Sequence, residues 1–427
     1  MWARALAAAL VATLTLGCGS SSEPDTHDGP PPADGAPADL PPAGPDLQPP
    51  ADGGGTSDGA TPNPCPRLPG PADAPRYVVV AHPFVAGGGK KSPSFEVLLL
   101  SKDGKLSKTG ETFTLDAAAT GGEIVFTPDG KVALAALEGG TVGVISLDAA
   151  GKATVIEKAL KTTAYTSRVV MGPEGRRAYL LSSQWRRHGG GVYSVKINCD
   201  GTITEEGLVA ASKLPYAMTL VGAPAPSRAL VVAKDILGSK AGDDVHLIGL
   251  GASWSLLAGV DAFGDDEAIV SAAALTPDER FLLVADNAGF SATGGDRVAV
   301  VELAGNTLKA TQVIKPIGDP AAIVASPHGN AALVLGAMSN TIALLSYDPA
   351  AAPPFKLAAA PQITGKPQLP TDAVMIRRGT LNGRVLITEN QSIRQLQFET
   401  SGALKEIELF SLGSGMTAIP GAIGIQP

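Results

Sequence analysis

Five consecutive residues have the side-chain types that could recognise a small ring-bearing or anionic ligand. They are Gln184, Trp185, Arg186, Arg187 and His188. An aromatic ring can stack on a flat group, and a guanidinium can bind a carboxylate or phosphate through paired hydrogen bonds. A solvated loop is the simpler interpretation of such a run. These five residues are therefore a candidate ligand-binding site.

A second set of candidate residues is acidic. It consists of Asp235, Asp243, Asp244, Asp261, Asp265, Asp266, Glu267, Asp286 and Asp296. Clustered carboxylates could hold Ca²⁺, which takes about six to eight oxygen ligands, and Asp265, Asp266 and Asp286 are the candidate ligands. Their spacing matches no calcium loop, so a solvated surface is the favoured interpretation. The sequence predicts neither a metal site nor a cofactor.

Motifs with fixed catalytic spacing give no further candidates. The sequence has no His-Glu-x-x-His and no Cys-x-x-Cys. The stretch Gly87–Ser92, GGGKKS, resembles a phosphate-binding loop only in composition. Catalytic residues therefore stay unidentified, and binding is favoured over catalysis.

The elements that must position these residues are short strands in a repeating unit. The stretch 124–148, IVFTPDGKVALAALEGGTVGVISLD, predicts strand, Pro-Asp-Gly turn, strand, small loop and strand. Apolar runs bounded by turn residues are typical of strands buried on both faces. Copies aligned on Pro128, Pro173, Pro226, Pro277 and Pro327 recur every 45 to 53 residues. This period is typical of propeller blades.

The count of copies predicts an all-β, seven-bladed β-propeller over residues 76–427. A sixth copy, DAVMIRRGTLNGRVLITEN, lacks the proline but keeps the order of strand, turn and strand. The last residues, GAIGIQP, match a first strand, whereas RYVVVAHP, from Arg76, matches a second strand with no first strand before it. We expect the C-terminal strand to join the N-terminal blade and close the ring, which removes free sheet edges.

Propeller topology places the two candidate sets on one face of the ring. The turns between first and second strands and between third and fourth strands share one face, here called the bottom. The longest loops fall on the opposite, top face: AHPFVAGGGKKSPS, SSQWRRHGGG, AKDILGSKAGDD and ADNAGFSATGGD. Binding residues concentrate in long loops on a rigid scaffold. The top face is therefore the predicted location of any site.

Two of the copies resemble those of the YVTN-repeat, lactonase-like seven-bladed propellers. They are TPDGKVALAALEGGTVGVISLD and TPDERFLLVADNAGFSATGGDRVAVVELAG, and the resemblance extends over residues 76–427. It implies the fold. It implies no single activity, because the family includes sugar-phosphate lactonases, cycloisomerases and secreted repeat proteins of no known activity. No lactonase site carries over residue by residue.

The N-terminus predicts export and lipid anchoring. Residues 1–17 combine one Arg with an apolar run too short to span a membrane, which is typical of a signal peptide. Leu16, Gly17 and Cys18 resemble a bacterial lipobox, although Thr15 stands where Leu is usual. The resemblance implies cleavage before Cys18 and lipid attachment to its sulfur; the alternative is an ordinary secretory signal. Gly19 lacks the Asp that retains some lipoproteins at the inner membrane, so we expect the outer membrane.

Residues 18–75 predict a disordered tether that begins at the lipidated Cys18. The stretch is rich in Pro, Gly, Ala and Asp and poor in apolar side chains that could offset the entropy of ordering. It also carries nine acidic residues against one basic residue, Arg67, which accounts for the net charge of −8. The remainder is nearly neutral, so a nucleic-acid partner is not expected.

Two cysteines remain after Cys18 is assigned to the anchor. Cys65 and Cys199 form an even pair in an exported chain, which favours a disulfide. Both are expected near the bottom face, since Cys199 lies in a predicted third-to-fourth turn. The alternative is two separate thiols.

Two functional hypotheses follow. The first is a monomeric, membrane-anchored propeller of the bacterial cell envelope that binds a protein or glycan partner, or acts as a scaffold. The alternative is a lactonase-like hydrolase or isomerase with its site on the top face.

Overall fold

The computed structural model describes residues 65, 67–85, 91–120, 122, 124–183, 189–264, 268–287, 295–413, 416–417 and 422–427. Residues 67–427 belong to one unit, and Cys65 belongs to another, residues 18–66. The predicted signal peptide, Cys18 and the tether up to residue 64 lie outside the described residues. Within the described ranges, no helix is long and apolar enough to cross a membrane.

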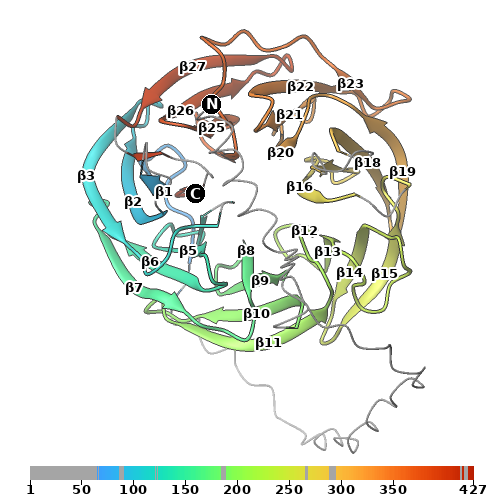
Figure 1. Ribbon diagram of the computed structural model, residues 1–427, viewed down its shortest axis with the longest axis horizontal. Coiled ribbons are helices and arrows are strands. Elements are labelled where there is room, and N and C mark those ends of the chain that lie inside the picture. The colour runs from blue at the N-terminus through green and yellow to red at the C-terminus, as the bar shows by residue number, and fades with distance from the viewer. Residues whose placement is uncertain are drawn as a thin grey trace, which may run out of the picture. The chain divides into compact units, whose positions relative to one another are not determined.

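Seven antiparallel sheets surround the ring axis as blades, which confirms the predicted propeller (Figure 1). Blade 1 consists of β28 (Met416–Thr417), β1 (Arg76–Val85), β2 (Lys91–Leu100) and β3 (Leu106–Thr114), with β29 (Ile423–Ile425) also paired to β1. Blade 2 consists of β4 (Val125–Phe126), β5 (Val132–Ala136), β6 (Val142–Leu147) and β7 (Ala153–Leu160). Blade 3 consists of β8 (Thr166–Met171), β9 (Arg177–Ser182), β10 (Gly191–Ile197) and β11 (Ile203–Ala211).

The remaining four blades repeat the same order from the ring axis outward. Blade 4 consists of β12 (Ala217–Val221), β13 (Arg228–Val232), β14 (Val245–Leu250) and β15 (Trp254–Val260). Blade 5 consists of β16 (Val270–Leu275), β17 (Phe281–Asp286), β18 (Arg297–Ala304) and β19 (Thr307–Ile314). Blade 6 consists of β20 (Pro320–Ala325), β21 (Ala331–Gly336), β22 (Thr341–Tyr347) and β23 (Phe355–Leu357). Blade 7 consists of β24 (Asp372–Met375), β25 (Arg384–Glu389), β26 (Ser392–Phe398) and β27 (Leu404–Ser411).

The position of a strand within its blade explains its hydrophobic pattern. Second strands such as β5, β17 and β21 are buried at every residue, because neighbouring blades cover both faces of the sheet. Outer strands such as β15 and β19 alternate between half-buried and exposed residues, because they lie at the rim. The core is accordingly divided into apolar clusters between blades.

The Thr-Pro-Asp-Gly turn of the repeat is held by its own side chains. Thr127 Oγ1 donates to Asp129 Oδ1 over 2.6 Å, and it accepts from the backbone N of Val132 at 3.1 Å. Gly130 has a φ of 69°, a conformation that glycine adopts without steric cost. The turn fixes the register of the first two strands, which is why the motif recurs with the blades.

The ring closes as the sequence predicts. Strand β29 pairs antiparallel with β1, and Val79 lies opposite Gly424. On its other side β29 approaches blade 2, where Ile124 N donates to Ile423 O over 3.0 Å. A Cβ at Gly424 would overlap with the carbonyl oxygen of Ile124, so this close approach requires glycine.

Gln426 joins two neighbouring blades at the closure of the ring. Its Oε1 accepts from the backbone N of Tyr77 at 3.0 Å, and its Nε2 donates to Gly130 O over 2.7 Å. Its carbonyl oxygen accepts from Arg76 Nη1 at 3.1 Å. The residue after β29 therefore connects blade 1 to the first turn of blade 2.

The segment of residues 67–75 contacts the bottom face before β1 begins at Arg76. Arg67 is buried, and it bonds Asp129 in a first-to-second turn and Asn198 in a third-to-fourth turn. Both kinds of turn therefore share one face, as predicted. Asp73 accepts from Thr380 N in blade 7 at 2.6 Å. This segment thus contacts blades on both sides of the closure.

Cys65 and Cys199 are both disulfide-bonded. We therefore expect no alkylation of these residues in the exported protein under denaturing, non-reducing conditions, and alkylation of both after reduction. Intact mass after iodoacetamide treatment measures this directly, and a Cys199→Ser chain that gains one reactive thiol without reduction is the matched control. Two alkylated cysteines in the unreduced protein would contradict the pairing.

The top-face loop predicted between the second and third strands of blade 1, which are β1 and β2, differs from the prediction. Much of AHPFVAGGGKKSPS is paired strand, because β1 continues to Val85 and β2 begins at Lys91. The pairing of Phe84 and Val85 with β28 stabilises this extension. The glycines at the tip predict only the turn, and the partner strand lies more than three hundred residues away in the sequence.

Candidate functional site

The predicted ligand-binding run lies outside the described residues. Gln184, Trp185, Arg186, Arg187 and His188 stand between β9 and β10. The structure does describe the base of this connection, where Ser182 lies opposite Gly191 in the ladder. The candidate ligand-binding run therefore stays a prediction. It connects β9 and β10, which pair with each other in blade 3.

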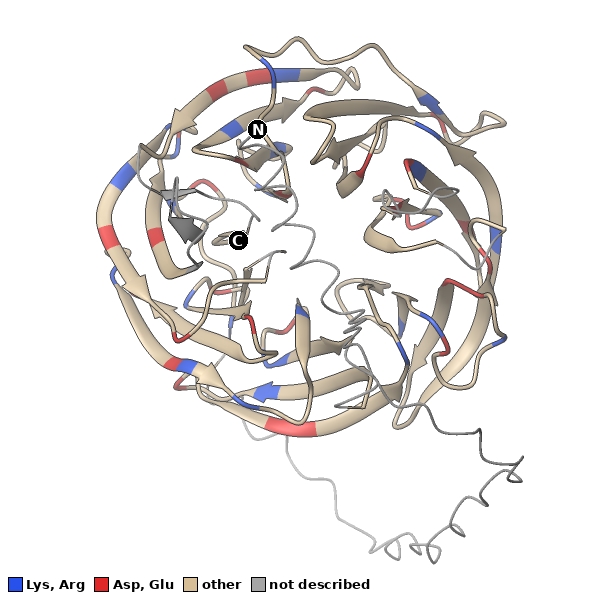
Figure 2. Ribbon diagram, in the orientation of Figure 1, with Lys and Arg blue, Asp and Glu red and all other residues tan. Residues whose placement is uncertain are grey.

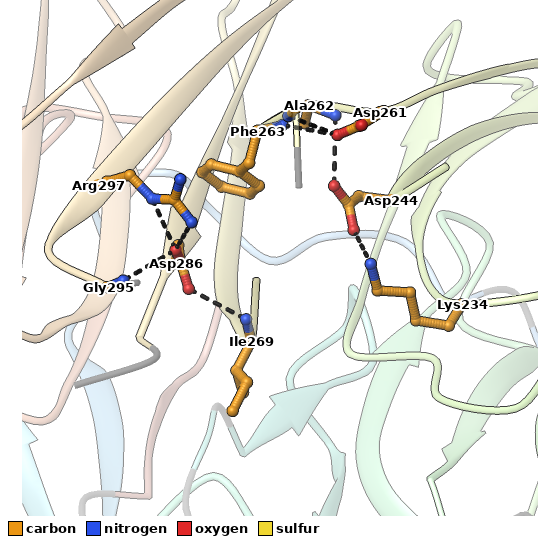
Figure 3. Close-up of polar contacts among 10 residues, drawn as sticks. Lys234, Asp244, Asp261, Ala262, Phe263, Ile269, Asp286, Gly295 and Arg297 are labelled. Carbon is orange, nitrogen blue, oxygen red and sulfur yellow. Dashed lines mark hydrogen bonds and ion pairs between the residues drawn. The ribbon is translucent and has the colours of Figure 1, made fainter. Parts of the chain in front are cut away.

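The acidic set contributes a buried carboxylate at the top of blade 5. Asp286 ends β17, and its side chain is fully buried. It accepts from Arg297 at 2.9 Å through Nε and at 2.5 Å through Nη2, and from the backbone N of Gly295 at 3.2 Å (Figure 3). The other carboxylate oxygen accepts from Ile269 N at 3.0 Å. Asp286 thus joins the connection between β17 and β18 to the entry of β16.

Arg297 extends this contact to the preceding blade. Its guanidinium carbon lies 5.0 Å from the ring centroid of Phe263, which follows β15 of blade 4 (Figure 3). Asp261 holds the same segment, since its Oδ1 accepts from the backbone N of Phe263 and of Gly264 at 3.1 and 2.6 Å. Cation–π contact and side-chain capping together fix the crossing between blades 4 and 5.

A second buried ion pair lies in blade 4. Asp244 is fully buried, pairs with Lys234 across the loop between β13 and β14, and accepts from Ala262 N at 3.3 Å (Figure 3). Burial raises the pKa of Asp244 above its ordinary value, although the hydrogen bond from Lys234 acts in the opposite direction. The carboxylate again holds the base of a top loop.

The other described members of the acidic set also interact with neighbouring residues or have a pKa changed by burial. Asp235 pairs with Lys213 at 2.5 Å on the surface, and Asp296 accepts from Asp319 N at 2.5 Å. Burial raises the pKa of Asp243. Among the residues that the structure describes, no group of three or more His, Cys, Asp or Glu could hold a metal ion. Asp265, Asp266 and Glu267 lie outside the described residues.

Neutralising Asp286 tests its structural role. We expect Asp286→Asn to lower the free energy of unfolding by about 2 kcal/mol, because Arg297 loses a buried charged partner. Asp235→Asn is the matched control at an exposed pair and should cost less than about 1 kcal/mol. Urea unfolding of both variants measures the difference. Equal losses would contradict the assignment of Asp286 as a buried support.

Blades 1 and 7 carry similar polar clusters that sequence reasoning missed. In blade 1, Glu96 is buried, with His82 Nε2 at 3.2 Å and Lys108 Nζ at 3.3 Å. Burial raises the pKa of Glu96, but its bonds to His82 and Lys108 outweigh this, and the pKa lies below its ordinary value. In blade 7, Arg394 is 1% exposed and pairs with Glu389. The sequence signal for such a cluster is a charged residue inside or at the end of an otherwise apolar strand.

Arg168 is a polar residue of the inner strands that the sequence analysis did not single out. It lies on β8 of blade 3, and its Nη2 donates to the carbonyl oxygen of Ser271 over 2.7 Å. Ser271 lies on β16 of blade 5 and donates to Pro320 O of blade 6 over 2.6 Å. The guanidinium therefore reaches past the intervening blade 4 on the side of the ring axis.

Two further features inside the blades do not form a polar site. His246 on β14 is fully buried, neither ring nitrogen has a hydrogen-bond partner within the part of the chain that the structure describes, and burial lowers its pKa to about 4. It is therefore neutral near pH 7.

A small cavity between blades 1 and 2 has apolar walls that include Phe95, Phe113 and Ile145. Such a lining offers no polar group to orient a ligand.

Comparison with known proteins supports the fold. No family model and no curated protein matches the sequence. A periplasmic gluconolactonase of Pseudomonas aeruginosa is similar in structure with a TM-score of 0.58 and 15% identity, over 83% of this chain and 99% of that one. A protein of Lactobacillus plantarum has a TM-score of 0.61 and 15% identity, over 83% and 100% of the two chains.

A third structure leads to the same conclusion. A candidate 6-phosphogluconolactonase of Bacteroides fragilis has a TM-score of 0.57 and 14% identity, over 84% of this chain and 99% of that one. Identities this low show a shared fold and not a shared reaction. The chain has the seven-bladed fold of the lactonase-like propellers.

Proposed function

We propose that this chain is a lipid-anchored binding propeller of the bacterial cell envelope, whose top loops recognise a protein or glycan partner. The anchor is Cys18 and the tether is the Pro- and Asp-rich stretch that follows it. The disulfide-bonded state of Cys65 and Cys199 supports export, because disulfides persist in oxidising compartments.

The observation that carries the binding role is the way the top loops are held. Asp244 with Lys234 and Asp286 with Arg297 fix the bases of two long loops through buried ion pairs. A rigid base with a variable loop above it is the arrangement in which loops serve recognition. These carboxylates also bond backbone amides, so they support the scaffold, and this favours binding over acid–base catalysis.

A binding assay tests the role of the candidate run in blade 3. The full chain with Cys18→Ser is incubated with purified peptidoglycan sacculi and, separately, with protein-containing outer-membrane vesicles, and the bound fraction is measured after sedimentation. We expect saturable binding to one of the two preparations. The affinity should fall at least about tenfold in the Arg186→Ala/Arg187→Ala variant, because charge-assisted hydrogen bonds are lost. Arg176→Ala/Arg177→Ala removes an adjacent arginine pair at the opposite end of β9 and is the matched control.

The anchor is tested separately. We expect cells fed radiolabelled palmitate to label the chain with native Cys18 and to leave Cys18→Ser unlabelled and released from the membrane fraction. Equal labelling of both chains would overturn the lipid anchor. If the chain binds neither sacculi nor vesicles, the recognition role is overturned, whereas the proposal of a lipid anchor is unaffected.

A second candidate function is a lactonase-like hydrolase. It is favoured by the inner-strand cation Arg168, which could bind an anionic sugar, and by the shared fold with a periplasmic gluconolactonase. Hydrolysis of gluconolactone and 6-phosphogluconolactone above the spontaneous rate, lost in Arg168→Gln with the melting temperature kept, would establish it in place of the binding role.

A further inference from the structure

Arg67 has an unusual environment for an arginine that follows a long polar segment. The residue is only 7% exposed. Its Nη1 pairs with Asp129 Oδ2 at 3.4 Å, and its Nη2 donates to the carbonyl oxygen of Asn198 over 2.7 Å. Asp129 lies in the turn between β4 and β5 of blade 2, and Asn198 lies in the turn between β10 and β11 of blade 3. The guanidinium is thus enclosed by turns of two neighbouring blades.

The peptide bond after Arg67 leads directly into exposed chain. Leu68 is 73% exposed, and residues 69–71 are exposed as well. The segment is held again at Ala72, whose carbonyl oxygen accepts from Arg76 Nη2 at 2.6 Å, and at Asp73. Exposed chain with small or polar residues is a preferred place for proteolysis. The side chain of Arg67 is therefore sequestered, whereas the chain that follows it is open to solvent.

The tether has no other place at which a protease specific for Lys or Arg could cleave. Residues 19–66 contain neither residue type, so Arg67 is the first basic residue after Cys18. In the propeller, by contrast, Lys and Arg occur in blades all round the ring (Figure 2). Cleavage after Arg67 would remove the whole tether and would leave the contacts of Asp73 and Arg76 with the propeller in place.

The two disulfide-bonded cysteines adjoin the same contact. Cys65 precedes Arg67 by two residues, and Cys199 follows Asn198 directly. Two residues span at most about 7 Å, so a disulfide that joins Cys65 to Cys199 holds Arg67 beside Asn198. Cys199 is exposed. Exposed disulfides are among those that exchange most readily with thiols.

We propose that the Arg67–Leu68 bond is a protected processing site, at which a trypsin-like protease releases the propeller from its tether after the disulfide between Cys65 and Cys199 has been reduced. Such a protease binds the Arg side chain against a carboxylate in its specificity pocket. In the folded chain the guanidinium is bound to Asp129 instead. Cleavage therefore requires Arg67 to leave Asp129, and the disulfide opposes this movement.

Two reactions make up the release. In the first, a protein dithiol reduces the disulfide by thiol–disulfide exchange: it gives up two electrons and two protons and becomes a disulfide, while Cys65 and Cys199 become thiols. In the second, the protease hydrolyses the peptide bond, so that water supplies a hydroxyl to the carbonyl carbon of Arg67 and a proton to the nitrogen of Leu68. Release from a membrane rests on the lipid anchor proposed above, whereas the cleavage does not.

Limited trypsin digestion of the full chain with Cys18→Ser tests the cleavage without the anchor. Mass spectrometry measures the rate at which a new N-terminus appears at Leu68. We expect this rate to be at least about tenfold higher in the Cys18→Ser/Cys199→Ser chain, with no reductant present, than in the disulfide-bonded chain, because proteolysis follows the population of the open form. Reduction of the disulfide-bonded chain with a phosphine should raise the rate equally.

Two controls accompany this digestion. Arg67→Gln should give no product that begins at Leu68 in either redox state. Thermal unfolding followed by circular dichroism should show that the reduced chain and the Cys199→Ser chain are both folded at the digestion temperature. Cleavage after Arg67 then reports local opening of the segment and not unfolding of the propeller.

A further pair of variants tests the contact of the guanidinium. In the reduced chain we expect Asp129→Asn to raise the rate of cleavage after Arg67 by about threefold, because Asn keeps an oxygen for the turn but lacks the charge. Asp278→Asn is the matched control and should leave the rate unchanged. Asp278 accepts from Thr276 in the equivalent turn of blade 5, and it bonds Tyr347 in place of Arg67.

Three results would overturn the proposal. The first is cleavage after Arg67 at the same rate in the disulfide-bonded and the reduced chain. The second is a reduced, folded chain that trypsin cleaves at other positions but not after Arg67. The third is an Asp129→Asn variant whose rate changes no more than that of Asp278→Asn. None of these outcomes depends on lipidation of Cys18, so they leave the proposed anchor and binding role to their own tests.

Discussion

Removal of residues 423–427 is expected to lower the melting temperature by more than about 10 °C. The deletion removes β29 and with it the buried side chains of Ile423 and Ile425, each worth roughly 2 kcal/mol. It also removes Gln426, which bonds both Tyr77 and Gly130. Blade 1 then keeps only the two-residue strand β28 on the inner side of β1, and blade 2 loses its contact with β29.

Thermal unfolding of the full chain and the truncated chain, followed by circular dichroism, measures this effect. A synthetic peptide with the sequence of residues 421–427 should restore part of the lost melting temperature when added in excess, because it can occupy the vacated edge of β1. A peptide with the same composition in scrambled order is the control. Unchanged melting after truncation would mean that the ring does not depend on this strand.

Replacement of Arg394 by Met should lower the free energy of unfolding by about 3–5 kcal/mol. The guanidinium of Arg394 is buried in blade 7, donates to Glu389 Oε1 over 2.5 Å and also pairs with Glu406. Its Nη1 donates further to Thr364 O over 3.0 Å, in the segment that leads to β24. Met fills similar volume but leaves the buried carboxylate of Glu389 without its counter-charge.

Denaturant unfolding measures the loss, and two further variants separate its causes. Arg177→Met removes an exposed arginine that pairs with Glu206, and it should cost less than about 1 kcal/mol. Arg394→Met combined with Glu389→Leu and Glu406→Leu should recover most of the loss, because no uncompensated buried charge remains. A triple variant as unstable as Arg394→Met alone would place the cause in packing and not in charge.

The fold could be predicted from the sequence because each blade repeats a local signal. The Thr-Pro-Asp-Gly turn is stabilised by Thr127 and Asp129 within its own residues, so its signal survives without tertiary information. Ring closure could also be predicted, because an unmatched strand at one end of the repeat series required its partner at the other. These inferences need only the count and order of strands.

The polar clusters could not be predicted in the same way. Asp286 was expected on a solvated acidic surface, yet it is buried, because Arg297 meets it through the register of two neighbouring strands. The contact between Arg168 and Ser271 crosses from blade 3 to blade 5, and sequence spacing carries no information on it. Side-chain contacts that depend on the tertiary structure produce no periodic pattern in a single sequence.

The closure of the ring also constrains how this chain can fold. Arg76 and Gln426 meet across 350 residues of sequence, so the first blade cannot be completed until β29 and Gln426 are present. Contacts of such separation carry a large loop-closure entropy and slow the final step of folding. During synthesis the growing chain exposes an unpaired edge of β1 until β29 is made, and an unpaired strand edge is a point at which misassembly between copies can begin.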